Sequence, residues 1–306
     1  MGLRARASGL KPLPRGIAFV IVLWVMALLA VLLGSFVLVA RTENLQTRHL
    51  FDTTQARYAA EAGISRASYE LRRTDPLARW VPDGRAYEFE FDGAKLKVEI
   101  TDESGKIDIN AADEPTLLAL FQSIGGVEAS DAQKLVDAVI DFRDPDDLIR
   151  PYGAEDDDYE AAGLSYGALD QNFAMPEELQ QVMGMDYELY RKLEPHITTF
   201  GLTNRPNAAF ASSTVLQVLP GITPDLATQI VEQRWLSRPG DPAAPALTLP
   251  DGTPVLAAGG GGTYTVRSRA TLPNRAWTIL EATIRLGGAP GARAYSVLRW
   301  REGSAE

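Results

Sequence analysis

An uninterrupted apolar run near the N-terminus constrains this chain more than any other feature. Residues 17–40 read IAFVIVLWVMALLAVLLGSFVLVA and contain no charged residue. A helix rises about 1.5 Å per residue, so a run of this length can cross a bilayer core of about 30 Å. The preceding segment is basic and lacks acids; its cations are Arg4, Arg6, Lys11 and Arg15. The sequence therefore predicts one transmembrane helix over 17–40, with a cytoplasmic N-terminus and the remaining chain on the other side of the membrane.

The residues before this run differ from an ordinary cleaved signal peptide, whose apolar region is about 7–15 residues long and ends at a small-residue cleavage site. A basic leader that ends in Gly16, directly before an apolar helix, resembles the leader of type IV prepilins. The resemblance implies a leader over 1–16, which a prepilin peptidase removes by cutting between Gly16 and Ile17. Most of that family has Glu at the fifth mature position, which is Ile21 here. The K-type minor pseudopilins of type II secretion typically lack this acid.

Composition limits the possible functions. The formal net charge is -10, cysteine is absent and only two histidines occur. An acidic chain is poorly suited to binding phosphates. Without cysteine there are no disulfides and no thiol catalysis, and a His-rich metal site is excluded.

The apolar run continues into a second predicted helix, and strand-like segments occur in two separate parts of the chain. Residues 41–73 contain no proline and carry an imperfect apolar stripe, so we expect a helix that packs against another element. Apolar and polar residues alternate on either side of Asp92-Gly93, which predicts a β-hairpin. Three further strand-like segments follow late in the chain, at 264–270, 276–286 and 294–300. We interpret 41–101 and 263–306 as the two parts of one α+β unit, a long helix packed on an antiparallel sheet, as in pilins.

The intervening segment, 102–240, has helical character and contains an internal repeat. Two stretches, 107–143 and 202–234, share a similar order of apolar positions around a glycine turn, at Gly126 and Gly221. Two short helices that meet at such a turn are typical of a helix-hairpin-helix motif. The sequence therefore predicts a large all-α insertion with two helix-hairpin-helix-like repeats.

This motif offers an alternative function, a membrane-anchored DNA-binding receptor whose glycine turns hold phosphates. Acids stand beside both turns here: Glu128 and Asp131 at the first and Asp225 at the second. Negative charge next to a phosphate weakens binding. We therefore expect the repeats to serve packing and expect no nucleic acid partner.

Acidic residues are densest between the two repeats. The candidate ligands are Asp141, Asp144, Asp146, Asp147, Glu155 and Asp156. Several carboxylates among Gly and Pro loop residues suit a hard cation such as Ca²⁺. The spacing does not match an EF-hand. A solvated acidic loop is the alternative interpretation.

The succession DESGKIDINAA, LVDAVIDFRDPDD, RPYGAEDDDYE, NFAMPEELQQVMGM and LPGITPDLATQIVEQR resembles the K-type minor pseudopilins of type II secretion. The resemblance covers nearly the whole chain. It implies a pilin-like fold with a large helical insertion, and a position at the tip of a short pseudopilus in the periplasm, anchored in the bacterial inner membrane. It also implies structural calcium in the insertion, in the DFRDPDD and GAED loops.

The same resemblance implies a set of partners. The I-type and J-type minor pseudopilins would bind through the N-terminal helix and the sheet, and prepilin peptidase would process the leader. The exported substrate and the secretin are further candidate partners.

Two remaining features complete the predicted organisation. The Pro- and Gly-rich segment 241–262 is expected to form a flexible loop that returns the chain to the sheet. No phosphate loop, Gly-x-Ser-x-Gly or HExxH motif occurs, and nothing in the sequence pairs carboxylates such as Asp141 and Glu155 across a cleft. We therefore expect no enzymatic activity.

Overall fold

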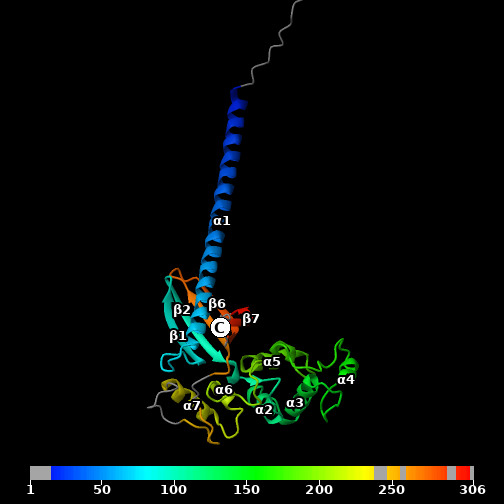
Figure 1. The fold of residues 1–306 in the computed structure, drawn as a ribbon. Coiled ribbons are helices and arrows are strands. Elements are labelled where there is room, and N and C mark those ends of the chain that lie inside the picture. The colour runs from blue at the N-terminus through cyan, green and yellow to red at the C-terminus, as the bar shows by residue number, and fades with distance from the viewer. Residues whose placement is uncertain (1–14, 238–246, 256–259, 288–293, 304–306) are drawn as a thin grey trace, which may run out of the picture. The chain divides into compact units, whose positions relative to one another are not determined.

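The computed structural model describes residues 15–237, 247–255, 260–287 and 294–303 (Figure 1). Most of the predicted leader, residues 1–14, therefore lies outside the described residues. The chain divides into two compact units, Met1–Gln55 and Ala56–Glu306.

One helix, α1 (Arg15–Leu71), replaces the two helical segments expected from the sequence. Its apolar N-terminal part has a window of 18 residues with a mean hydropathy of 2.8, none of which is buried within the protein. This helix is long and apolar enough to cross a membrane. Gly16 and Ile17 lie in its first turn.

A five-stranded antiparallel sheet forms the first layer of the second unit, in the order β1-β2-β5-β6-β7. The strands are β1 (Asp83–Phe91), β2 (Ala94–Asp102), β5 (Thr263–Thr271), β6 (Trp277–Leu286) and β7 (Tyr295–Glu302). All four neighbouring pairs are antiparallel. The expected α+β arrangement, a long helix and an antiparallel sheet, is confirmed.

The predicted turn joins β1 to β2. Asp92 and Gly93 both have positive φ, 48° and 77°, as a type I′ hairpin turn requires. Phe91 pairs directly with Ala94 across this turn. The Asp-Gly dipeptide thus sets the register of the first hairpin.

The last turns of α1 cover one face of this sheet. Small and aliphatic residues at helical spacing, Ala56, Ala60, Ile64 and Ala67, are completely buried. They belong to one core with the alternating apolar residues of the strands: Leu96, Val98, Ile100, Val266, Ala270, Leu280, Ala282 and Ile284. Burial of this apolar surface is the main contribution to the stability of the layer pair.

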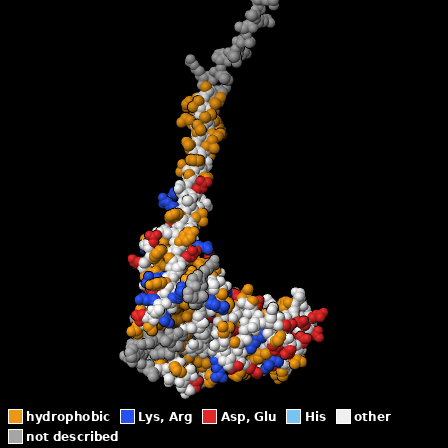
Figure 2. All heavy atoms as spheres, viewed as in Figure 1, with side chains coloured by type: hydrophobic (Ala, Val, Ile, Leu, Met, Phe, Trp, Pro, Cys, Tyr) orange, Lys and Arg blue, Asp and Glu red, His pale blue; other side chains and the backbone are white. Residues whose placement is uncertain are grey.

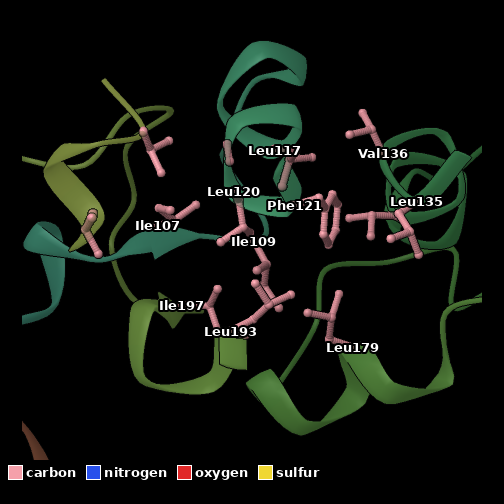
Figure 3. Packing of buried hydrophobic residues seen from close by; sticks show 14 of the residues in the cluster. Ile107, Ile109, Leu117, Leu120, Phe121, Leu135, Val136, Leu179, Leu193 and Ile197 are labelled. Atoms are coloured by element: carbon pink, nitrogen blue, oxygen red, sulfur yellow. The ribbon is translucent and has the colours of Figure 1, made fainter. Parts of the chain in front are cut away.

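The chain leaves the sheet after β2 and returns at β5, and the departing Asp102 pairs with the returning Tyr264. Between them lie α2 (Glu114–Ala119), α3 (Ala129–Arg143), α4 (Asp156–Ala161), α5 (Tyr187–Leu193), α6 (Ser213–Leu216) and α7 (Pro224–Leu236). Shorter 3₁₀ and π turns connect several of them. This insertion has a hydrophobic core of its own, whose centre includes Leu117, Phe121 and Leu193 (Figure 3).

The prediction of an all-α insertion is wrong in one respect. Two short strands, β3 (Ile107–Asp108) and β4 (Ile197–Thr198), pair in parallel within it. Each strand is two residues long, which is too short for a period-2 pattern from which a strand could be predicted. The pairing ties the beginning of the insertion to its middle.

The two stretches of the internal repeat, 107–143 and 202–234, share several local features. The turns at Gly126 and Gly221 have φ of 72° and 78°, which glycine adopts without a Cβ penalty. Arg143, at the end of α3, donates to the carbonyls of Ile109 and Ala112. Arg234, near the end of α7, donates in the same way to two carbonyls of the second stretch, those of Ala208 and Ala211.

Part of the predicted loop 241–262 packs against the insertion. Thr248 and Pro254 form an isolated antiparallel bridge, and Leu249 and Val255 are buried in the core of the insertion. Residues 241–246 and 256–259 of this loop lie outside the described residues.

Candidate functional site

The six predicted ligands of the insertion lie on α3, on α4 and in the loop between them. Figure 2 shows acidic side chains gathered on the surface around α4. Their exposure differs: Asp141 is fully buried and Glu155 is 9% exposed, whereas Asp146, Asp147 and Asp156 are exposed. Burial thus divides the six predicted ligands into an inner and an outer group.

Asp141 lies on the inner side of α3. Its Oδ2 accepts a hydrogen bond from the backbone N–H of Arg150, at 3.0 Å. Its Oδ1 is buried without a hydrogen-bond partner. Gly153 passes so close to this carboxylate that an added Cβ would lie 1.7 Å from Oδ2. The loop is therefore folded directly over Asp141.

Asp144 and Glu155 stand at the two ends of the loop. Asp144 follows the last residue of α3, and Glu155 precedes the first residue of α4, where its backbone N–H donates to Asp158 Oδ2 at 3.1 Å. Asp144 Oδ1 and Glu155 Oε1 are both buried without a partner. A buried carboxylate oxygen without a donor costs free energy unless a proton or a cation satisfies it.

The electrostatic interactions show that these groups are close. The pKa of Glu155 is raised to about 7, first by burial and then, in decreasing order, by the charges of Asp141, Asp144, Asp170 and Asp147. The pKa of Asp141 is also raised, first by burial and then by Asp144 and Asp137, against the favourable charge of Arg150. Burial and Asp146 raise the pKa of Asp144. The fold therefore concentrates negative charge that Arg150 offsets only in part.

The outer carboxylates make local contacts. Asp146 Oδ1 accepts from the N–H of Leu148 at 3.0 Å, and Asp156 Oδ1 accepts from the N–H of Ala168 at 2.9 Å. Through the latter contact, Asp156 faces the loop that carries Asp170, whose pKa is raised by burial and by Asp156 and Asp147.

The donor set fits a hard cation. Asp141, Asp144 and Glu155 offer three buried oxygens that lack donors, and carboxylate oxygens are the ligands that Ca²⁺ prefers. Among the residues that the structure describes, no three Asp, Glu, His or Cys side chains are already arranged as a complete metal site. Binding would therefore require these side chains to turn toward a common point.

Two acids of this region were absent from the sequence prediction. Asp170 stands in a loop after α4, with a positive φ of 52°, and Asp137 lies one turn before Asp141 on α3, 2% exposed. Asp137 and Asp141 are four residues apart, which places them on one helix face. That spacing could have identified Asp137, whereas only the tertiary fold brings Asp170 near.

Comparison with known proteins connects this region to one family. The family described as "Type II secretion system (T2SS), protein K" matches residues 96–201, which include the whole acidic region. Type II secretion system protein K of Pectobacterium carotovorum is 30% identical over 210 residues, 60% of this chain and 62% of that protein. The Klebsiella pneumoniae protein of the same name is 27% identical over 204 residues, 60% of this chain and 62% of that protein.

The chain is similar to type II secretion system protein K. It matches 62% of the length of these two relatives. The protein K match begins in β2 and ends after β4, so it covers the first part of the insertion and the sheet strand that leads into it.

A solved structure supports the same fold over more of the chain. The crystal structure of the GspK-GspI-GspJ complex from enterotoxigenic Escherichia coli contains a chain that matches with a TM-score of 0.58 and 22% identity. The alignment covers 85% of this chain and 100% of that chain. This chain therefore shares the fold of that solved chain.

Proposed function

We propose that this chain is a K-type minor pseudopilin, a non-catalytic component at the tip of a type II secretion pseudopilus that takes part in its initiation and in protein export across the outer membrane. The observation that carries the proposal is the combination of a protein K match with an antiparallel sheet that a helical insertion interrupts between β2 and β5. The solved complex that contains the chain with the same fold consists of GspK, GspI and GspJ. On this basis the partners are the I-type and J-type minor pseudopilins.

The N-terminal part of α1 suits a single-pass anchor in the bacterial inner membrane. Basic residues precede the apolar run, and positive charge is retained on the cytoplasmic side. The main domain would then be periplasmic. Prepilin peptidase would cut between Gly16 and Ile17 and leave the helix on the mature protein.

The helical insertion supports a place at the tip. It adds a second hydrophobic core to the helix–sheet unit, and this extra volume would obstruct regular stacking of identical subunits along a filament. A single subunit at the end of the filament avoids this obstruction. From there, the insertion could meet exported substrate or the secretin.

The proposal includes a structural calcium ion in the insertion. Asp141, Asp144 and Glu155 would hold it with their unpartnered oxygens, and Asp146, Asp147 and Asp156 are the outer candidates. When bound, Ca²⁺ would supply the positive charge that this cluster lacks. A ligand that binds only the folded state stabilises it by RT ln(1 + [L]/Kd), about 2.7 kcal/mol at a hundredfold excess over Kd.

The DNA-receptor alternative has little support from the described surface. The groove beside the Gly126 turn is lined by three acids, Asp131, Asp186 and Glu188, and by two lysines. One of these lysines, Lys134, is paired with Asp131 at 2.8 Å. A phosphate entering this groove would meet more negative than positive charge.

The proposal is tested by affinity purification of the tagged full-length protein from detergent-solubilised membranes that contain the I-type and J-type pseudopilins of the same organism. We expect both partners to co-purify and the mature protein to begin at Ile17. Recovery of the protein alone, or retention on duplex DNA at physiological salt, would contradict the proposal. A mature N-terminus near Arg41 would indicate an ordinary signal peptide instead.

A further inference from the structure

Arg150 occupies an unusual place beside the acidic cluster. It lies in the loop between α3 and α4, and its guanidinium contacts carboxylates on two different helices. Nε donates to Asp137 Oδ1 on α3 at 3.2 Å, and Nη2 donates to Glu114 Oε2 on α2 at 2.6 Å. The side chain therefore fastens the loop to both helices.

The backbone of the same loop is fastened to the same face of α3. The N–H of Arg150 donates to Asp141 Oδ2 at 3.0 Å, and the N–H of Tyr152 donates to Asp137 Oδ2 at 3.2 Å. Asp137 and Asp141 are one helical turn apart, so their carboxylates lie on one face of α3. Each carboxylate accepts a hydrogen bond from a different backbone N–H of the loop. Gln133 extends this row by donating to Asp137 Oδ1 and to Glu114 Oε1, at 3.1 Å each.

The distribution of these contacts separates two roles. Asp137 and Glu114 form ion pairs with the guanidinium of Arg150, whereas Asp141 receives only the backbone N–H of that residue and keeps Oδ1 without a partner. Asp141 is thus held in position by a hydrogen bond that leaves one of its oxygens available. Glu155 lies only five residues beyond Arg150 on the same loop, so a fixed loop also limits where Glu155 can lie.

We infer that Arg150, through Asp137 and Glu114, is a positioning residue that presets Asp141 and the loop leading to Glu155 for calcium. This inference rests on the calcium part of the proposed function. Arg150 itself would not touch the ion. Groups that orient metal ligands typically change metal affinity by about 10–100-fold when removed, and we expect a loss in this range.

The test is isothermal titration of calcium chloride into the metal-free full-length protein in detergent micelles. Arg150→Gln removes the charge, and Arg150→Lys keeps it but loses the planar fork that reaches two carboxylates. We expect Kd to rise about tenfold or more for Arg150→Gln and by a smaller factor for Arg150→Lys. Arg205→Lys is the matched control, since Arg205 pairs with Asp113 outside the cluster, and its Kd should match that of the wild type.

Melting curves separate positioning from a purely structural role. If Arg150 positions the ligands, the increase in Tm that calcium produces should shrink in Arg150→Gln. An equal loss of Tm with calcium and with chelator, at unchanged Kd, would overturn the inference. Should Arg150→Gln not fold, Arg150→Lys and Glu114→Gln provide the same comparison, because Glu114 is 45% exposed at its side chain and lies on a different helix.

The outcome also distinguishes this inference from the proposed function. A wild-type protein that does not bind calcium would refute the calcium proposal and the inference with it. A wild-type protein that binds calcium, with Arg150 variants of equal affinity, would refute the role of Arg150 alone.

Discussion

Gly153 and Asp141 are so close that a Cβ at position 153 would lie 1.7 Å from Asp141 Oδ2. No side chain other than hydrogen fits there without displacing a carboxylate that is itself fully buried. The acidic cluster is therefore shaped by a glycine as much as by its acids.

Gly153→Ala should destabilise the insertion by about 1–3 kcal/mol, the usual cost of forcing extra volume into a packed site. It should also weaken calcium binding, because Asp141 must move. Urea unfolding of the metal-free protein measures the first effect. Adding Asp141→Ala should recover part of the lost stability, since it removes the atoms that the new Cβ meets. Equal stability of Gly153→Ala and the wild type would contradict the close approach.

Gly63→Ala should separate α1 from the sheet. An added Cβ would lie 2.1 Å from Ser268 Oγ and 3.1 Å from side-chain atoms of Leu96 and Val98. We expect a loss of about 1–3 kcal/mol in the free energy of unfolding. Combining it with Ser268→Ala should restore part of this loss, as a double-mutant cycle would show. Additive effects of the two substitutions would mean that the two residues do not meet.

The contribution of Glu155 to the stability of the calcium-free protein should fall as the pH rises, whereas burial lowers the pKa of His196, which acts in the opposite direction. The ordinary pKa of a Glu side chain is 4.5, and that of Glu155 is raised to about 7. Between these values Glu155 binds more protons in the folded protein than in the unfolded chain, so its contribution to the free energy of unfolding decreases from about pH 4.5 to about pH 7 and then levels off. The raised pKa values of Asp141, Asp144 and Asp170 act in the same direction.

Melting temperatures recorded in chelator across this pH range test the effect. In Glu155→Gln the melting temperature should fall less as the pH rises. Glu160 is an exposed acid on α4, so Glu160→Gln should leave the pH dependence of the melting temperature unchanged. Calcium should also make the melting temperature fall less with pH, because the ion would compensate the charge of the ionised carboxylates. The same slope in the wild type and in Glu155→Gln would show that another group dominates.

Arg234→Met should be among the more damaging substitutions at a charged residue. Arg234 is 2% exposed and donates to the carbonyls of Ala208 and Ala211, at 2.9 Å each. Its Nε lies 3.7 Å from Asp83 Oδ2, whose other partner is Arg85 at 2.7 Å. Removing one partner of a buried ion pair typically costs about 3–5 kcal/mol.

Arg57→Met provides the control for Arg234→Met. Arg57 pairs with Glu61 and Glu302, but its side chain is 47% exposed, and exposed pairs contribute about 0–1 kcal/mol. Denaturant unfolding should separate the two variants clearly. Similar losses would show that the buried contacts of Arg234 contribute little.

Local patterns predicted the helix–sheet unit well. The uncharged run from Ile17 to Ala40 and the alternation around Asp92-Gly93 are signals that act over a few residues, and both elements are present. The strand order was not predictable in the same way, because β2 pairs with β5 across the whole insertion. The two-residue strands β3 and β4 carry no pattern at all.

The segment that contains the candidate site was predictable from the sequence, but the positions of its side chains in space were not. Composition identified the acidic segment, yet the sequence could not show that Asp141 would be fully buried while Asp146 is exposed. That difference arises from packing of the α3–α4 loop against α3. The contact of Arg150 with Glu114 joins residues 36 positions apart, which no local pattern encodes.

Immunogold labelling of isolated pseudopili that contain a tagged form of the chain tests the proposed tip position. We expect gold particles at one end of each labelled pseudopilus and none along its length, because the insertion would obstruct stacking within the filament. Gold particles distributed along the filament would contradict the tip position, as would pseudopili that lack the chain altogether.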